Sequence, residues 1–155
     1  MRRIALVLGL AVLSTHPALA QAGRKIRVDG IRPLAFGALL SGAPTTVLRT
    51  DPANSGQFDL TAQNNDVVIL TFSLPSSMSG PSGASLPLSF SGSDAGFSPS
   101  QSIGAQVTFD PRQSYVATMS QQGRGSVFLG GTATPAFNQR PGSYSATITL
   151  TVMYP

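Results

Sequence analysis

The chain of 155 residues has no cysteine, no glutamate and no tryptophan, and its single histidine is His16. Without cysteine there is no disulfide, so a hydrophobic core of ordinary size must hold the fold. With only His16 and no thiol, we exclude imidazole- or thiolate-ligated metal sites and catalytic pairs of histidine with serine or cysteine. The composition therefore predicts no metal and no cofactor.

Acidic residues are also scarce, because six aspartates are the only ones. They adjoin turn residues, as in Asp51-Pro52, Asn65-Asp66, Ser93-Asp94 and Asp110-Pro111. Turn chemistry accounts for them without catalysis. One route to an enzyme stays open, since two aspartates that converge in one cleft could act as a carboxylate pair. The expectation from the residues is nevertheless a protein that is not an enzyme and has no catalytic residues.

Positive charge is sparse and gathers near the N-terminus, at Arg24, Lys25, Arg27 and Arg32. Such a cluster is typical of a solvated arm, and it could also attract an anionic surface. No basic patch interleaved with aromatic residues follows it, so we expect no nucleic-acid partner.

Long hydrophobic runs are absent except for residues 4–13, which follow the basic Arg2 and Arg3 and precede Pro17-Ala-Leu-Ala20. This order predicts a secretory signal peptide, residues 1–20, cleaved after Ala20. An N-terminal membrane anchor is the alternative, but the run falls short of the ~20 apolar residues that span a bilayer. We therefore expect an exported bacterial protein, in the periplasm, at the cell surface or outside the cell, with no transmembrane segment.

The remaining apolar residues come in short bursts between Gly, Pro, Asn and Asp turns, which is typical of β-strands. The expected strands are residues 31–40, 45–49, 57–61, 67–74, 86–90, 105–109, 115–119, 125–129 and a final strand. This pattern predicts an N-terminal arm, residues 21–30, and one antiparallel β-sandwich, residues 31–155. The expected core is Phe36, Phe58, Leu60, Val68, Leu70, Phe72, Phe109, Val116, Phe128, Ile148, Leu150 and Val152. The apolar run at 67–74 predicts a central strand covered on both faces.

The final strand is the clearest pattern in the chain. Pro141-Gly142 is a turn, and the residues after it alternate between an apolar and a Ser/Thr row. The apolar row is Tyr144, Ala146, Ile148, Leu150, Val152 and Tyr154. Alternation with period two predicts a half-buried strand over 143–154. Because this strand closes the chain, we expect it at a sheet edge, where a partner could reach it.

Several motifs resemble an exported bacterial family known as domain of unknown function 4402. They are Leu34-Ala-Phe-Gly37 followed by Leu39-Leu-Ser-Gly42, Gln57-Phe-Asp-Leu-Thr61, Val68 to Pro75, Gly125 to Gly131 and Pro141 to Tyr154. The resemblance covers about residues 31 to 155. That family is similar to pilin-like and spore-coat-like subunits, and the resemblance implies an immunoglobulin-like sandwich.

The resemblance also implies a mode of association. In pilin-like subunits a glycine before the last strand and a penultimate tyrosine, here Gly142 and Tyr154, belong to a groove that an extended segment of the next subunit fills. Ile26 and Val28 are the apolar residues that such a segment could offer here. From residue chemistry alone, Gly142 is a turn glycine and Tyr154 an aromatic at a strand end. The strand-addition residues are then Ile26, Val28, Gly142, Tyr144, Ile148, Leu150, Val152 and Tyr154.

Two functions follow from these features. The first is an exported, non-catalytic structural subunit of a surface or periplasmic assembly, fimbrial or pilin-like, with itself, other subunits and a periplasmic chaperone as partners. The second is a monomeric secreted module that binds a glycan or another surface polymer through the loops 76–86 and 91–102. These loops carry no tryptophan or tyrosine for stacking on sugars, which favours the first function.

Overall fold

A computed structural model describes residues 24–155 of the chain. The predicted signal peptide lies outside these residues. The described part is all-β, and its strands pair antiparallel, which confirms the predicted fold class. The strands are β1 (Arg27–Arg32), β2 (Thr45–Val47), β3 (Gly56–Thr61), β4 (Val67–Ser73), β5 (Ser77–Ser79), β6 (Ser85–Ser89), β7 (Ala95–Ser98), β8 (Val107–Phe109), β9 (Tyr115–Thr118), β10 (Arg124–Leu129), β11 (Gly131–Ala133) and β12 (Thr149–Met153).

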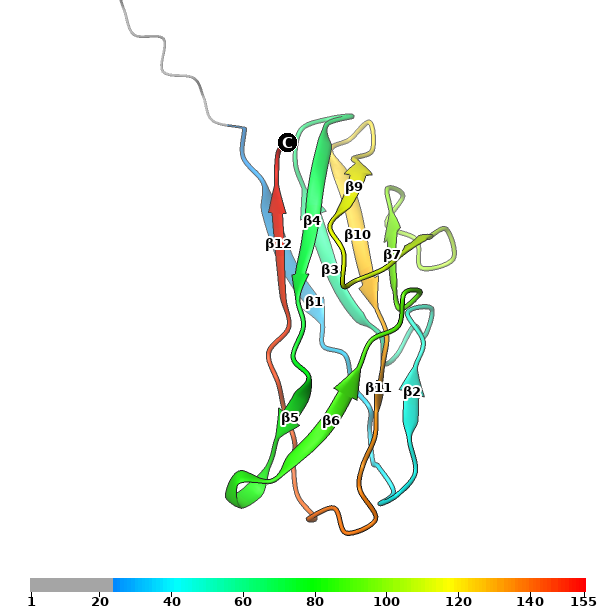
Figure 1. Cartoon of the computed structure of the whole chain (residues 1–155). Helices are drawn as coiled ribbons and strands as arrows, with labels where there is room; N and C mark the ends of the chain where they lie inside the picture. Colours follow the sequence, from blue (N-terminus) through cyan, green and yellow to red (C-terminus); the bar gives the residue numbers. More distant parts are fainter. Residues whose placement is uncertain (1–23) are drawn as a thin grey trace, which may run out of the picture.

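Two sheets form the layers of a sandwich. One has the order β1-β3-β10-β7-β8 and the other the order β12-β4-β9. Figure 1 shows β12, β4 and β9 in front of β3 and β10. The main core fills the space between the layers and takes Leu60, Val127 and Phe97 from one sheet and Val68 and Leu150 from the other. Burial of each such side chain stabilises the fold by ~1.5–3 kcal/mol, which substitutes for disulfides.

The two layers are joined at one end of the molecule. A third sheet has the order β2-β11-β6-β5, where β11 follows β10 after Gly130 and β5 follows β4 in the chain. Because β6 pairs with both β5 and β11, it links the continuations of the two layers, as the lower half of Figure 1 shows. A second, smaller core of Met78, Leu86, Leu88 and Ala133 lies there.

The sides of the sandwich differ. On one side the short connection 110–114 carries the chain from β8 in one layer to β9 in the other. On the opposite side β1 and β12 each end their sheet, and neither pairs with the other. We call the side bounded by β1 and β12 the open side of the sandwich.

β10 and β7 are the strands covered on both faces, and the prediction that residues 67–74 would be is wrong. Residues 125–129 of β10 are all buried, whereas β4 alternates between buried and more exposed positions. β4 is central, between β12 and β9, but its outer face meets solvent. The outer face of β10 is covered because Ser126 bonds Asp59 and because Arg49 and Gln106 lie over the neighbouring Gly96.

Other predictions were also wrong. The first strand was expected over 31–40, but β1 ends at Arg32, and residues 27–30 of the expected loose arm belong to it. Pro33 explains this shift, because proline has no N–H to donate to a ladder. Val116, expected in the core, is 62% exposed, since its neighbours Tyr115 and Ala117 point inward instead. By contrast, the prediction that Phe128 is buried is confirmed, although it lies outside the main core cluster.

Candidate functional site at the open side of the sandwich

The open side contains a cavity of about 370 Å³ between the two layers. One wall is the stretch Gly30 to Leu34 at the end of β1, and the other is formed by Ala146 and Ile148, which lead into β12. Phe58 and Leu129 also line it. The lining is mostly apolar, and the volume falls within the range of ~300–1,000 Å³ typical of binding cavities. The sandwich is therefore incompletely filled between the end of β1 and the residues that precede β12.

Next to it, a second cavity of about 730 Å³ shares Pro33 and Leu34 with the first. It lies between the irregular segment 33–41 and residues 135–144, and Met78 and Leu86 also line it. The two cavities follow the same side of the molecule, and residues 141–148 form much of the wall away from β1.

At one end of the open side, contacts of Tyr154 join the end of the chain to the N-terminal segment and to Gln63. The Arg24 guanidinium lies 5.5 Å from the centre of the Tyr154 ring, and the Tyr154 hydroxyl accepts a hydrogen bond of 3.3 Å from the Gln63 N–H. Ile26 packs against the main core close to this end of β1. Tyr154 thus has a structural role as the anchor that holds the last strand beside the N-terminal segment.

The two edge strands differ in how well they are protected against pairing. β1 carries Arg27, Asp29 and Arg32, its register slips between Gly30 and Arg32, and Pro33 follows it. Charge, bulges and proline are the devices by which proteins block a sheet edge. β12 reads TLTVM and has none of these devices, and no charged residue occurs from Pro141 to Pro155. β12 is therefore the less protected of these two edges.

The predicted strand over 143–154 is shorter in the structure. β12 covers Thr149–Met153, and before it only an isolated bridge joins Ser145 to Ser79 of β5. Within β12 the alternation is as expected, since Leu150 is buried, Val152 is half-buried, and Thr149, Thr151 and Met153 are exposed. Pairing with β4 in an unbroken register holds the strand in place.

The predicted interaction residues fall into three groups. Ile148, Leu150 and Val152 pack toward the core along β12, together with Tyr154. Gly142 and Tyr144 lie elsewhere, where the Tyr144 hydroxyl donates to the Arg140 carbonyl at 2.7 Å and the ring covers Gly80. Ile26 packs against the main core and Val28 pairs within the ladder of β1 and β3, so both belong to the chain's own fold.

The position of Val28 bears on the expected donor segment. Val28 lies opposite Leu60 in the ladder between β1 and β3, and five residue pairs form that ladder. These residues can reach a second subunit only if β1 leaves β3. Sequence reasoning did not include Gly30 to Leu34 in the site. These residues lie beside Ile148 only because the fold brings together two segments that are distant in the sequence.

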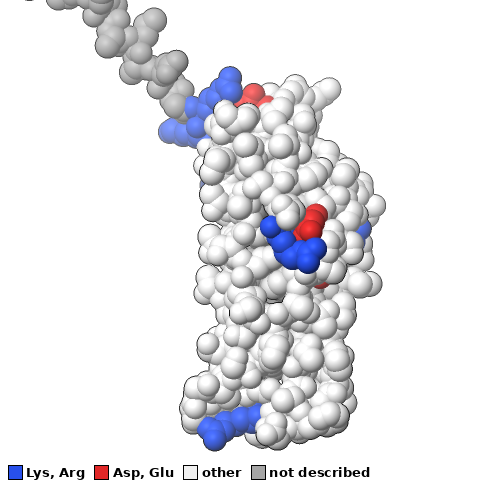
Figure 2. Space-filling model, viewed as in Figure 1, with Lys and Arg blue, Asp and Glu red and all other residues white. Residues whose placement is uncertain are grey.

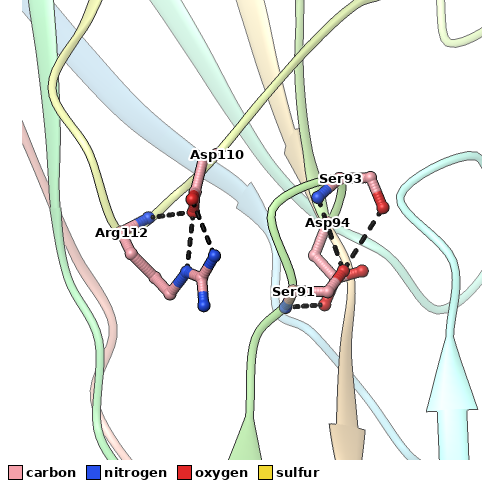
Figure 3. Close-up of polar contacts among 5 residues, drawn as sticks. All are labelled: Ser91, Ser93, Asp94, Asp110 and Arg112. Carbon is pink, nitrogen blue, oxygen red and sulfur yellow. Dashed lines mark hydrogen bonds and ion pairs between the residues drawn. The ribbon is translucent and has the colours of Figure 1, made fainter.

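A pair of converging aspartates was the remaining hypothesis for catalysis. Figure 3 shows two of the six aspartates, Asp94 and Asp110. Asp110 accepts from Nε of Arg112 at 2.9 Å and from its second guanidinium nitrogen at 2.8 Å, and these hydrogen bonds lower the Asp110 pKa to about 2. Asp94 accepts from the Ser91 N–H at 2.7 Å within its own turn. Each carboxylate is engaged by its own turn, as turn chemistry predicts.

Charge is scarce on the face that carries β12. Figure 2 shows it as largely uncharged, with charges gathered near one end, in one patch at mid-height and at the other end. The three strands β12, β4 and β9 contain no charged residue. Their outer face instead carries Met153, Ile69 and Val116 in one cross-strand row.

The chain matches no protein-family model and no curated protein. Among residues 24–155, no three acidic, histidine or cysteine side chains gather where they could hold a metal ion. Within the same residues, no helix is long and apolar enough to cross a membrane.

Proposed function

We propose that this chain is an exported, non-catalytic structural subunit of a surface or periplasmic assembly, pilin-like in its immunoglobulin-like sandwich, and that it associates by strand addition at the free edge of β12. One observation carries the proposal: β1 and β12 are sheet edges on the same side of the sandwich, a mostly apolar cavity lies between the end of β1 and the residues that precede β12, and β12 has no charged side chain. The resemblance to domain of unknown function 4402 remains part of the proposal.

The physics of strand addition fits this edge. An added strand gains main-chain hydrogen bonds to the unpaired N–H and C=O groups of β12, and its alternate side chains enter pockets beneath the edge. The cavity beside Ile148 offers such a pocket. The uncharged Thr149, Thr151 and Met153 impose no repulsion on the incoming chain. Ile26 and Val28 belong to the fold of their own subunit, so the added strand is a segment other than residues 26–28.

The test compares two lysines on opposite edges of the same sheet. Thr151→Lys puts a charge on the free edge of β12, and Val116→Lys puts one on the edge strand β9, also on the outer face. The full chain is expressed in bacteria with residues 1–20 in place, and the exported protein is sized in its cell fraction, with SDS resistance before and after heating. We expect Thr151→Lys to abolish assembly and Val116→Lys to leave it intact.

A wild-type chain that stays monomeric at high concentration, also in the presence of other exported subunits and a periplasmic chaperone, contradicts the proposal. One observation favours the alternative of a glycan-binding module, namely the 730 Å³ cavity lined partly by Met78 and Leu86 of the loop 76–86. The other loop expected to bind, residues 91–102, contains the buried strand β7 and lines neither cavity. Glycan-array binding that Tyr144→Ala abolishes would make the alternative the better reading.

A further inference from the structure

The chemistry of β12 allows it to pair with a copy of itself. Its outward row is Thr149, Thr151 and Met153, and its inward row is Leu150 and Val152. Two copies of the strand, antiparallel about a two-fold axis at Thr151, keep both rows in register because the side-chain period is two. Leu150 of one copy then lies opposite Val152 of the other, and Thr151 lies opposite itself.

We propose that a second copy of this chain is the partner at the open side, and that the two β12 strands pair antiparallel about such a two-fold axis. The inference rests on the proposed function, since it names the occupant of the same edge. The result is one continuous sheet with the order β9-β4-β12-β12-β4-β9 across two subunits.

Charge is the argument for a second copy over an unrelated strand. In a two-fold interface each residue near the axis meets its own kind, so any charge there repels itself. From Pro141 to Pro155 the chain has no charged side chain. On β1, the Arg27 Nε lies 2.7 Å from an oxygen of Asp29, so these two charges are paired within the chain.

The other edges of the described sheets are poorer sites for such pairing. β2, β5 and β8 span three residues each, and β9 spans four. β1 is longer, but its bulge and charges block a regular ladder. β12 is the longest edge strand of the described sheets without a bulge or a charge. Its outward residues Thr149, Thr151 and Met153 are exposed.

Single cysteines test the register, because the chain has none of its own. Directly opposite residues in an antiparallel pair have Cα atoms ~4.5–5.5 Å apart, which is within disulfide reach. We expect Thr151→Cys to form a disulfide-linked dimer under mild oxidation. Thr71→Cys is the matched control, because Thr71 is the ladder partner of Thr151 on β4, and two such cysteines would be about 14 Å apart, three strand spacings.

The offset pair gives a second, independent readout. Thr149 of one copy is expected opposite Met153 of the other, so Thr149→Cys and Met153→Cys should cross-link when mixed but not when alone. Charge exchange gives a third: Thr151→Lys and Thr151→Glu should each raise the dimer dissociation constant at least about tenfold, and an equal mixture should restore dimers. These exposed positions leave the core intact, which circular dichroism of each variant checks.

Two results overturn the inference. One is Thr151→Cys cross-linking no faster than Thr71→Cys, and the other is Thr149→Cys cross-linking alone as fast as in the mixture. If assembly persists in either case, the proposed strand addition survives with another partner or register. If the wild-type chain forms no assembly under any condition, the proposed function fails together with the inference.

Discussion

The proposals require that β12 is held rigidly in its own subunit, and Leu150→Ala tests this. Leu150 is 8% exposed, belongs to the main core and lies opposite Phe72 in the ladder with β4. Truncation of a buried leucine to alanine removes transfer free energy and leaves a cavity, at a cost of ~2–5 kcal/mol. Because Leu150 sits on an edge strand, where neighbours can partly close the gap, we expect about 3 kcal/mol.

That loss is large for a domain of this size. Domains are stable by ~5–15 kcal/mol, so about 3 kcal/mol is a fifth or more of the total. The thermal midpoint should fall by about 10 °C. Urea unfolding should show a lower midpoint with an unchanged m-value, because the surface exposed on unfolding stays the same.

The control is Thr149→Val, on the same strand but on the exposed outer face. Valine keeps the β-propensity, so the free energy of unfolding should change by less than about 0.5 kcal/mol. Measurements belong at low protein concentration, because association with a partner adds apparent stability. If Leu150→Ala costs less than about 1 kcal/mol, β12 is not docked in solution, and there is no rigid edge for a partner to extend.

Three further predictions follow from other parts of the fold. Gly123→Ala should lower the free energy of unfolding in urea by at least about 1 kcal/mol, because Gly123 has a φ of +67° and a Cβ there would overlap the Ala62 carbonyl. The control Gly30→Ala has open space around the added Cβ and should leave that free energy nearly unchanged. Val116→Thr should change stability by less than about 0.5 kcal/mol, and a larger loss would put this side chain back in the core. The Asp110 pKa is lowered from 3.8 to about 2 by its hydrogen bonds to Arg112, so the stabilisation by this carboxylate is present above pH 3.8 and is lost as the pH falls toward 2. In Asp110→Asn, the thermal midpoint should therefore depend less on pH between 3.8 and 2 than in the wild type.

The fold class followed from the sequence because most strands show period-two alternation between turn residues. The expected strands 57–61, 67–74 and 125–129 agree with β3, β4 and β10 to within one residue. Their apolar residues face one shared core, so local pattern and burial agree. The terminal strand was too long by six residues at its start, because alternation continues through 143–148 where pairing does not.

Strand β7 was missed for a physical reason. It reads AGFS and lies within a Ser/Gly-rich stretch expected to be a loop, yet all four residues are buried. Gly96 is needed there because Gln106 and Arg49 occupy the space of a side chain, and the Ser98 hydroxyl accepts from the Ser102 N–H. β7 packs Ala95 and Phe97 in the main core and has polar neighbours at Gly96 and Ser98. Because both faces are covered and the strand is short, it shows no alternation of buried and exposed residues, and composition alone indicates a loop.

One wall of the candidate site could be predicted from the sequence and the other could not. The apolar alternation of Ile148, Leu150 and Val152 indicated an edge strand with one buried face. The other wall, Gly30 to Leu34, could not be inferred, because β1 begins before the expected domain boundary and meets residue 148 only through the topology of the sandwich. The role of Tyr154 depends in the same way on Arg24 and Gln63.

The contrast between the two edge strands is the strongest reason to regard the open side as functional. A bare β edge invites uncontrolled pairing, and proteins that do not use such an edge protect it. This chain protects β1, which lies in the other layer at the usual sheet separation of about 10 Å, with charge, a bulge and Pro33. It leaves β12 without a charge, a bulge or a proline. If Thr151→Lys, which adds the missing protection, changed neither the assembly nor the aggregation of the chain, the bare edge would be incidental, and both proposals would lose their physical basis.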